Sequence, residues 1–243
     1  MATTTEIAAP LLRLQQLRFR YPQSDPEIGD DNSGHFQLQL PEFTVRAGES
    51  IAITGPSGSG KTTLLLLIAG ILLPEQGTIT LDKTTVNQQS ERWRRRFRAQ
   101  RIGMVFQSFE LLEYLSVLEN ILLPLRLVGS RSIARYRSRA MILAERTGIE
   151  HKLRARPAQL SQGERQRAAV CRALICKPPL ILADEPTGNL DPASKQRVVD
   201  LLLQQCADTG SALLMVTHDT SLTSRFDRTC AFGDLLQQRG ARV

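Results

Sequence analysis

A glycine-rich turn in the first quarter of the chain has the residue types and the spacing needed to hold a phosphate. Residues 55–62 read Gly-Pro-Ser-Gly-Ser-Gly-Lys-Thr, the pattern G-x-x-x-x-G-K-[ST], and lie between an expected buried strand at 50–54 and an expected helix from about Lys61. Glycines let successive backbone N–H groups converge on an anion, and a helix N-terminus adds partial positive charge. The expected phosphate ligands are Gly55, Ser57, Gly58, Ser59, Gly60, Lys61, Thr62 and Thr63.

A second cluster supplies the acidic groups that such a turn needs. The Lys61 ammonium is expected to reach the β- and γ-phosphates, and the Thr62 hydroxyl to ligate Mg²⁺. Residues 180–183 form an apolar strand followed by Asp184 and Glu185, at the carboxyl end where ligands bind in open α/β sheets. We expect Asp184 to hold Mg²⁺ and Glu185 to act as general base for an attacking water. Without the glycine-rich turn, the two carboxylates would be read as a polar strand end.

The elements that must position these groups alternate between short strands and helices. This alternation indicates an α/β fold with a largely parallel sheet. Between about 108 and 160 the pattern is helical, with capping-box spacing at Ser116–Glu119 and Ser161–Glu164. A polar segment at 22–34 is expected to be a surface loop or partly disordered. The expected strands are 12–21, 36–45, 50–54, 77–82, 102–106, 180–184 and 212–217.

Length and composition exclude several classes of protein. A chain of 243 residues with 42% apolar residues is long enough for one domain with a substantial core. Its longest apolar run, 64–73, is ten residues long, whereas a membrane-spanning helix needs about twenty. The N-terminus lacks the features of a secretory signal, so a cytoplasmic protein is expected. The four cysteines have neither metal nor disulfide spacing, which favours buried thiols.

Further residues resemble the motifs of ATP-binding cassette ATPases. Residues 160–167, Leu-Ser-Gln-Gly-Glu-Arg-Gln-Arg, resemble the family's signature sequence, and residues 188–191, Gly-Asn-Leu-Asp, resemble its D-loop. Gln107 resembles the Q-loop residue, His218 the switch histidine and Tyr21 the aromatic A-loop residue. With the P-loop and the acidic strand end, these motifs follow the family's order over about residues 12–233.

The resemblance implies a fold and a set of roles. It implies one nucleotide-binding domain over residues 1–243: a P-loop core with a mostly parallel sheet, an antiparallel β subdomain, and a helical subdomain inserted at about 108–177. The tail at 1–10 is expected to be disordered. The implied roles are adenine stacking for Tyr21, contact with Mg²⁺ or water for Gln107, a hydrogen bond to the γ-phosphate for His218, contact with the partner subunit's ATP for Ser161 and Gly163, and arrangement of the opposite site for Asp191. The usual glycine at the third of these signature positions is Gln162 here.

The resemblance also implies partners. One P-loop and one signature in the chain imply a homodimer around two ATP molecules, and the absent membrane domain implies separate permease subunits, with the ATPase on the cytoplasmic face of the bacterial inner membrane. Residues 106–120 and 184–191 resemble the lipoprotein-releasing, macrolide-exporter and cell-division group, which favours export or mechanotransmission. The apolar stretch at 109–115 is expected either to receive a permease helix or to pack inside the helical insert.

Two alternatives follow from the same motifs and from the charge. One is an importer ATPase of the same family. The other is a non-transport cassette acting on nucleic acid or ribosomes, since the net charge is +7 and arginines cluster at 92–101 and 131–139. Direct nucleic-acid binding is not expected, because paired cassettes and long coiled-coil insertions are missing. The cluster at 92–101 is expected to be a solvated loop, or one near anionic headgroups; its role and that of 22–34 stay open.

Overall fold

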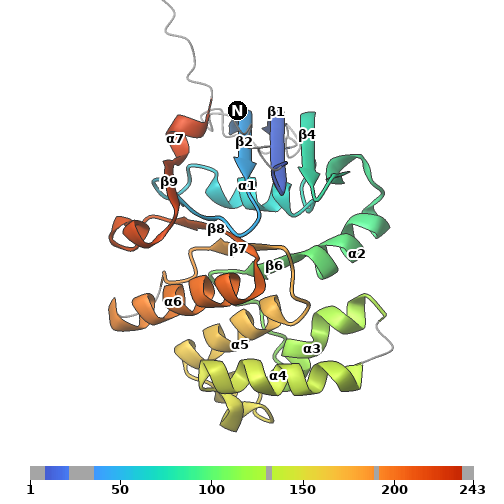
Figure 1. Cartoon of the computed structure of the whole chain (residues 1–243), viewed down its shortest axis with the longest axis vertical. Helices are drawn as coiled ribbons and strands as arrows, with labels where there is room; N and C mark the ends of the chain where they lie inside the picture. The colour runs from blue at the N-terminus through green and yellow to red at the C-terminus, as the bar shows by residue number, and fades with distance from the viewer. Residues whose placement is uncertain (1–8, 22–35, 130–132, 189–191, 237–243) are drawn as a thin grey trace, which may run out of the picture.

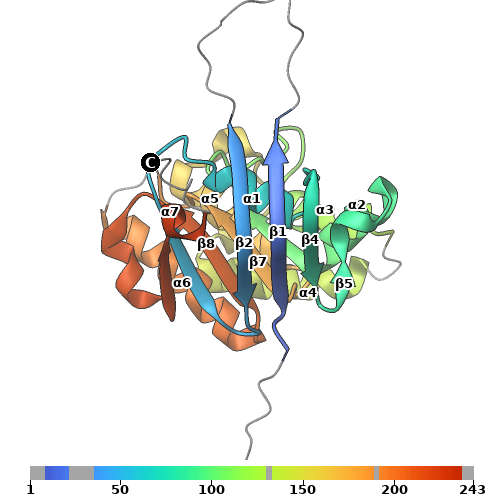
Figure 2. The ribbon, with the colours of Figure 1, turned by 90° about the horizontal axis from the view of Figure 1, so that it is seen from above.

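The computed structural model describes residues 9–21, 36–129, 133–188 and 192–236, and these form two sheets with helices between and below them (Figure 1). The antiparallel sheet has the strand order β2-β1-β4-β5. Its strands are β1 (Leu12–Arg20), β2 (Gln37–Val45), β4 (Gln76–Leu81) and β5 (Thr84–Thr85). Alternate residues of β1 and β2 are buried, because only one face of this sheet packs on the core. Figure 2 shows β2, β1 and β4 side by side on the face of the molecule.

The second sheet is parallel and carries the strand ends that build the site. Its order is β6-β7-β8-β3-β9, and each described pairing is parallel. Its strands are β3 (Ser50–Thr54), β6 (Ile102–Val105), β7 (Leu180–Asp184), β8 (Ala212–Thr217) and β9 (Arg228–Ala231). Strands β3, β7 and β8 are buried along almost their whole length, as continuous apolar runs covered on both faces require. Their carboxyl ends share one edge.

The helices divide between the sheets and the far end of the molecule. Helix α1 (Lys61–Ile68) lies between the two sheets and shares one core with both (Figure 1). Helices α3 (Val117–Leu127), α4 (Ile133–Thr147) and α5 (Gln162–Leu174) pack on one another at the end opposite the antiparallel sheet, with α6 (Pro192–Thr209) beside them. The remaining helices are α2 (Glu91–Arg101), α7 (Phe232–Leu235) and the short 3₁₀ segments Val86–Gln88, Glu150–Lys152, Pro157–Gln159 and Thr220–Arg225.

The α/β class with a parallel sheet is confirmed, and the expected strands end within about one residue of the observed ones. The expectation of a loop at 92–101 is wrong. These residues form α2, which begins at the N-cap Ser90, whose hydroxyl accepts from the Trp93 backbone N–H. Arg94 is buried and donates to the carbonyls of Gly70 and Gln89, so it anchors α2 to the end of α1. Residues 1–8 of the tail and the segment 22–34 lie outside the described residues.

Two of the four cysteines are buried, as expected for thiols without metal or disulfide spacing. Cys171 and Cys206 are buried, which raises the pKa of each thiol to about 12, while Cys176 and Cys230 are half-buried. All four thiols are free. Among the residues that the structure describes, no helix is both long enough and apolar enough to span a bilayer.

Candidate nucleotide site

The glycine-rich turn connects the carboxyl end of β3 to α1. Gly58 and Gly60 have φ angles of +75° and +103°, which a glycine adopts without strain and a residue with a Cβ does not. Lys61 is 4% exposed, and its Nζ donates to the carbonyls of Gly55 (2.8 Å) and Pro56 (2.7 Å), closing the turn on itself. The buried Ser59 Oγ has no hydrogen-bond partner among the described residues, so the turn holds an unsatisfied polar atom that suits a phosphate ligand.

The first helical turn of α1 meets the end of β7. Thr62 Oγ1 donates to Asp184 Oδ1 at 3.2 Å. Burial is the main cause that raises the pKa of Asp184, and the charge of Glu185 adds to it, while the Thr62 hydrogen bond opposes it. A hydroxyl and a carboxylate this close form an oxygen pair of the kind that Mg²⁺ uses, since it takes one or two protein ligands together with phosphates and water. No group of three or more His, Cys, Asp and Glu residues suited to a metal occurs in the described ranges.

Glu185 lies between a lysine and a histidine. Its Oε2 is 3.0 Å from His218 Nδ1, and its Oε1 is 3.8 Å from Lys61 Nζ. The Glu185 side chain is 15% exposed and that of His218 50%, so the pair faces an opening rather than the core. Glu185 has φ +42°, although it is not a glycine. Such a left-handed backbone costs about 1–3 kcal/mol and is concentrated at functional sites.

Aromatic residues lie over the same helix start. The Tyr21 hydroxyl hydrogen-bonds Thr63 Oγ1 at 2.9 Å, which fixes its half-exposed ring. The ring centroid of Tyr21 lies 4.9 Å from that of Phe19 and 5.9 Å from that of Phe36. The Phe36 ring lies against Gly60, where a Cβ would meet it at 2.3 Å. Phe36 was not among the residues expected at this site; the signal for it was an aromatic at the start of the expected strand 36–45.

Gln107 follows β6 and reaches the segment after Glu185. Its Nε2 lies 3.1 Å from the position that a Cβ on Gly188 would take, so a side chain at Gly188 would crowd the amide. Gly188 N also donates to the Glu185 carbonyl at 3.0 Å. The structure therefore brings Gln107 to the backbone that carries Glu185. Asp191, expected in the same motif, lies outside the described residues.

Comparisons with known proteins identify the arrangement. The family model described as "ABC transporter" matches residues 38–188. The chain belongs to the ABC transporter family. It is 46% identical over 187 residues to the "Lipoprotein-releasing system ATP-binding protein LolD" of Hydrogenovibrio crunogenus, covering 77% of this chain and 81% of that protein. It is also 45% identical, over 76% of the chain and 75% of the relative, to an "Uncharacterized ABC transporter ATP-binding protein" of Mycobacterium tuberculosis.

Solved structures agree with the sequence relatives. A dimeric post-hydrolysis structure of the ATP-binding cassette MJ0796, bound to ADP and phosphate, has a TM-score of 0.76 at 31% identity, over 90% of this chain and 92% of that one. The structure of cbiO1 from Clostridium perfringens, part of an ABC transporter complex, has a TM-score of 0.71 at 28% identity, over 86% and 79% of the two chains. The chain is an ATP-binding and ATP-hydrolysing subunit of an ABC transporter, and the non-transport alternative is not favoured.

The signature segment of this cassette begins α5 and is held by its own cap. Ser161 Oγ accepts from the Glu164 backbone N–H, and the Glu164 carboxylate accepts from Ser161 N at 2.8 Å. Ser161 and Gln162 are exposed, and Gly163 is half-buried. The side-chain hydrogen bonds that the structure gives for Ser161 all stay within this cap, so among the described residues no hydrogen bond of this side chain reaches the P-loop of its own chain.

The stretch after Gln107 is organised by a buried amide at the start of α3. Asn120 is fully buried. Its Oδ1 accepts from Leu112 N (2.8 Å), and its Nδ2 donates to the carbonyls of Leu112 (3.1 Å), Leu115 (3.3 Å) and Ser116 (3.1 Å). Within this stretch Phe109 is buried and Tyr114 is 70% exposed. Its apolar residues therefore divide between internal packing and the surface.

Proposed function

We propose that this cassette hydrolyses ATP with Mg²⁺ through the side chains that converge at the carboxyl ends of β3, β7 and β8. The observation that carries the proposal is the chain of contacts from Thr62 to Asp184 and from Lys61 through Glu185 to His218. Lys61 exchanges its two loop carbonyls for β- and γ-phosphate oxygens. Thr62 and Asp184 would hold Mg²⁺, Gln107 would approach it from the end of the neighbouring strand β6, and Tyr21 would stack on the adenine.

In this mechanism each residue acts on a defined group. Mg²⁺, when bound, supplies neutralisation of the charge on the transferred phosphoryl oxygens. Glu185 accepts the proton of the attacking water, and the hydrogen bond from His218 fixes the orientation of that carboxylate. The positive charge of Lys61 and the backbone N–H groups of the turn stabilise the charge of the transition state and hold the phosphates in position, without covalent chemistry.

The exposed end of α5 supports a dimeric active form. Ser161 and Gly163 begin a helix whose N-terminal N–H groups carry partial positive charge, and the side-chain hydrogen bonds of Ser161 among the described residues stay within the helix cap. We assign them to the γ-phosphate held by a second copy, so that two ATP molecules lie between two chains. The dimeric MJ0796 structure, bound to ADP and phosphate, supports this arrangement.

A groove between α2 and α3 supports docking of a separate permease. Its volume is about 870 Å³. Ile71 and Leu127 on its wall are 41% and 71% exposed, unusually high for large apolar side chains. Five arginines and two glutamates also line it, so its net charge is +3: Arg92, Arg95, Arg96, Arg98, Arg172, Glu91 and Glu110. We assign the groove to an amphipathic permease helix that carries acidic residues.

The similarity to lipoprotein-releasing ATP-binding proteins supports one direction and one cargo. We propose that the assembled transporter releases lipoproteins from the membrane, with this subunit on its cytoplasmic face, and that closure of the dimer does mechanical work on the permease. Import is the disfavoured alternative, because the chain is 46% identical to the lipoprotein-releasing ATP-binding protein named above.

The decisive experiment replaces the proposed base. Glu185→Gln keeps the size of the side chain and its contact with His218, but it removes the proton acceptor. We expect ATP binding to persist, hydrolysis to fall by about 10²–10⁴ and the dimer to accumulate on size-exclusion chromatography with ATP. Turnover equal to that of the unaltered protein would remove Glu185 from this role.

Two further variants separate binding from coupling. Lys61→Ala should lose ATP binding, and retained affinity would overturn the phosphate assignment. Arg92→Glu/Arg96→Glu should leave basal hydrolysis intact and abolish stimulation by the reconstituted permease, whereas Arg154→Glu, an exposed charge outside the groove, serves as the matched control. Equal stimulation of all three proteins would place the permease elsewhere.

A further inference from the structure

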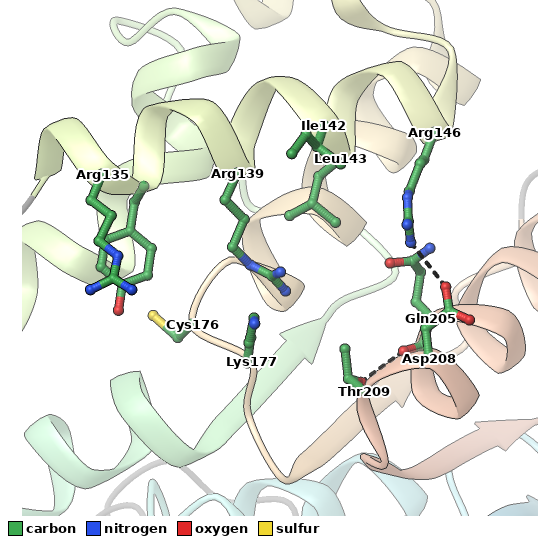
Figure 3. Close-up of a pocket in the computed structure, with 11 residues that line it drawn as sticks. Arg135, Arg139, Ile142, Leu143, Arg146, Cys176, Lys177, Gln205, Asp208 and Thr209 are labelled. Carbon is green, nitrogen blue, oxygen red and sulfur yellow. Dashed lines mark hydrogen bonds and ion pairs between the residues drawn. The ribbon is translucent and has the colours of Figure 1, made fainter.

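A second cavity lies far from the nucleotide site and gathers positive charge. It has a volume of about 790 Å³ and lies between α4, the turn before β7 and the end of α6 (Figure 3). Lys177 precedes β7 and Thr209 precedes β8, so the cavity is at the amino ends of strands whose carboxyl ends hold Asp184 and His218. The length of β7 alone separates the two sites by about 15 Å.

The charges that line this cavity are unbalanced. Four cationic side chains face one carboxylate: Arg135, Arg139, Arg146 and Lys177 against Asp208. Arg146 Nη1 donates to Asp208 at 2.9 Å, which satisfies that pair. The net charge of the lining is therefore +3. Arg135 and Lys177 have no hydrogen bond or ion pair in the part of the chain that the structure describes, so two cations are left to a ligand.

Two of the cations face each other. In Figure 3 Arg139 points down from α4 and Lys177 points up toward it from the turn. Arg139 is held in place, because its Nε and Nη2 donate to the carbonyls of Ile175 and Leu174 at 3.0 Å each, at the end of α5. Burial lowers the pKa of Arg139, and the nearby Arg146 lowers it further. An anion bound at Arg139 would offset its burial and its repulsion by Arg146, and Lys177 faces the same space (Figure 3).

The chemistry of the lining selects the kind of anion. A guanidinium offers a planar fork that matches phosphate oxygens, and a lysine adds a mobile point charge. The Nη1 group of Arg139 has no hydrogen bond to a carbonyl among those that fix the side chain, so it stays available. A volume of about 790 Å³ is that of a small-molecule pocket rather than of a single-ion site.

We propose that this cavity binds a phosphate-bearing anion, either a soluble phosphorylated metabolite or the headgroup of an anionic lipid, between Arg135, Arg139 and Lys177. The site is independent of the P-loop and adds a second anion-binding function to the cassette. Because Arg139 joins α4 to the end of α5, the bound anion stabilises the position of the helix that begins with Ser161 and Gly163.

The test uses the full chain with the Lys61→Ala substitution, which removes phosphate binding at the P-loop. Binding of inorganic pyrophosphate to this protein is measured by calorimetric titration. Binding of the protein to phosphatidylglycerol vesicles is measured by flotation, with phosphatidylcholine vesicles as reference. Arg135→Gln/Lys177→Gln should weaken the binding about tenfold or more, since two charged donors are lost. Arg137→Gln, on the same helix but outside the cavity, should change nothing.

The outcomes separate the sources of the phosphate. Loss of pyrophosphate binding in the double variant supports a soluble ligand, and loss of vesicle binding alone supports a lipid headgroup. The charge-conserving Arg135→Lys/Lys177→Arg variant should keep most of the affinity, and thermal melting verifies that each variant is folded. The proposal is overturned if the double variant binds both probes as its parent does, or if the parent binds neither at millimolar concentration.

Discussion

Replacement of Asn120 by leucine tests whether one buried amide holds the segment between Gln107 and α3. The substitution removes one accepted hydrogen bond and the two N–H groups that three carbonyls share, at 2.8–3.3 Å; at most three full hydrogen bonds of about 0.5–1.5 kcal/mol net give a total of about 1.5–4.5 kcal/mol. Burial of the larger apolar side chain recovers about 1–2 kcal/mol. We therefore expect a loss of about 2 kcal/mol in the free energy of unfolding, which lowers the Tm by about 4–8 °C in a chain of this length.

The assay is calorimetric melting supported by urea unfolding, and Asn87 provides a graded control. Asn87 is half-buried and makes two hydrogen bonds of its own, with Ile79 N and the Gly77 carbonyl, so Asn87→Leu should cost about half as much. ATP affinity should stay within about twofold of the unaltered protein, because Asn120 lies outside the proposed nucleotide site. A loss below about 1 kcal/mol for Asn120→Leu, or a larger loss for Asn87→Leu, would refute the reasoning.

Three further predictions follow from the same contacts. Tyr21→Ala should weaken ATP binding by about 5- to 150-fold, since stacking on an aromatic is worth about 1–3 kcal/mol, whereas Tyr21→Phe should lose little affinity. Calorimetric titration distinguishes the two variants, and an ATP affinity of Tyr21→Ala equal to that of the unaltered protein would exclude stacking. Hydrogen bonds from Ser221 and Lys195 lower the pKa of Asp219 to about 2, so its contribution to stability is present at neutral pH and is lost as the pH falls toward 2. Asp219→Asn should therefore cost about 1 kcal/mol at pH 7, after solvent screening, and nothing near pH 2; a cost independent of pH contradicts the assignment. Burial raises the pKa of Cys171 and Cys206 to about 12, so a thiol reagent at pH 8 should modify these two cysteines only on unfolding. Mass spectrometry locates the label, and rapid labelling of Cys171 or Cys206 in the native protein would contradict their burial.

The strongest sequence predictions rest on local pattern. The P-loop lies between a buried strand and a helix, and the acidic pair follows the apolar strand β7. Both therefore lie at the carboxyl ends of parallel strands, which share one edge of the sheet. The capping boxes at Ser116 and Ser161 are likewise local, and both are present in the structure. For these elements the local sequence is enough to predict the structure.

The arginine cluster at 92–101 shows where local pattern fails. The segment 92–101 contains six arginines and shows little apolar periodicity, a pattern that predicts a solvated loop. Arg94 instead donates to two backbone carbonyls, of Gly70 and Gln89, and α2 covers the end of α1. Partners this distant in sequence are set by packing, and no periodicity within 92–101 reports them.

The sequence by itself determined the fold class and the family, and it predicted the residues of the proposed nucleotide site, because short motifs fix the backbone geometry and charge at those positions. Only the tertiary structure decided what surrounds them. It placed Phe36 against Gly60, gave Asn120 its four partners, and brought the cations of α4 to Lys177 across a shared cavity. These arrangements join segments up to about 40 residues apart whose side chains have no common period, and they depend on how the helices pack on the sheets.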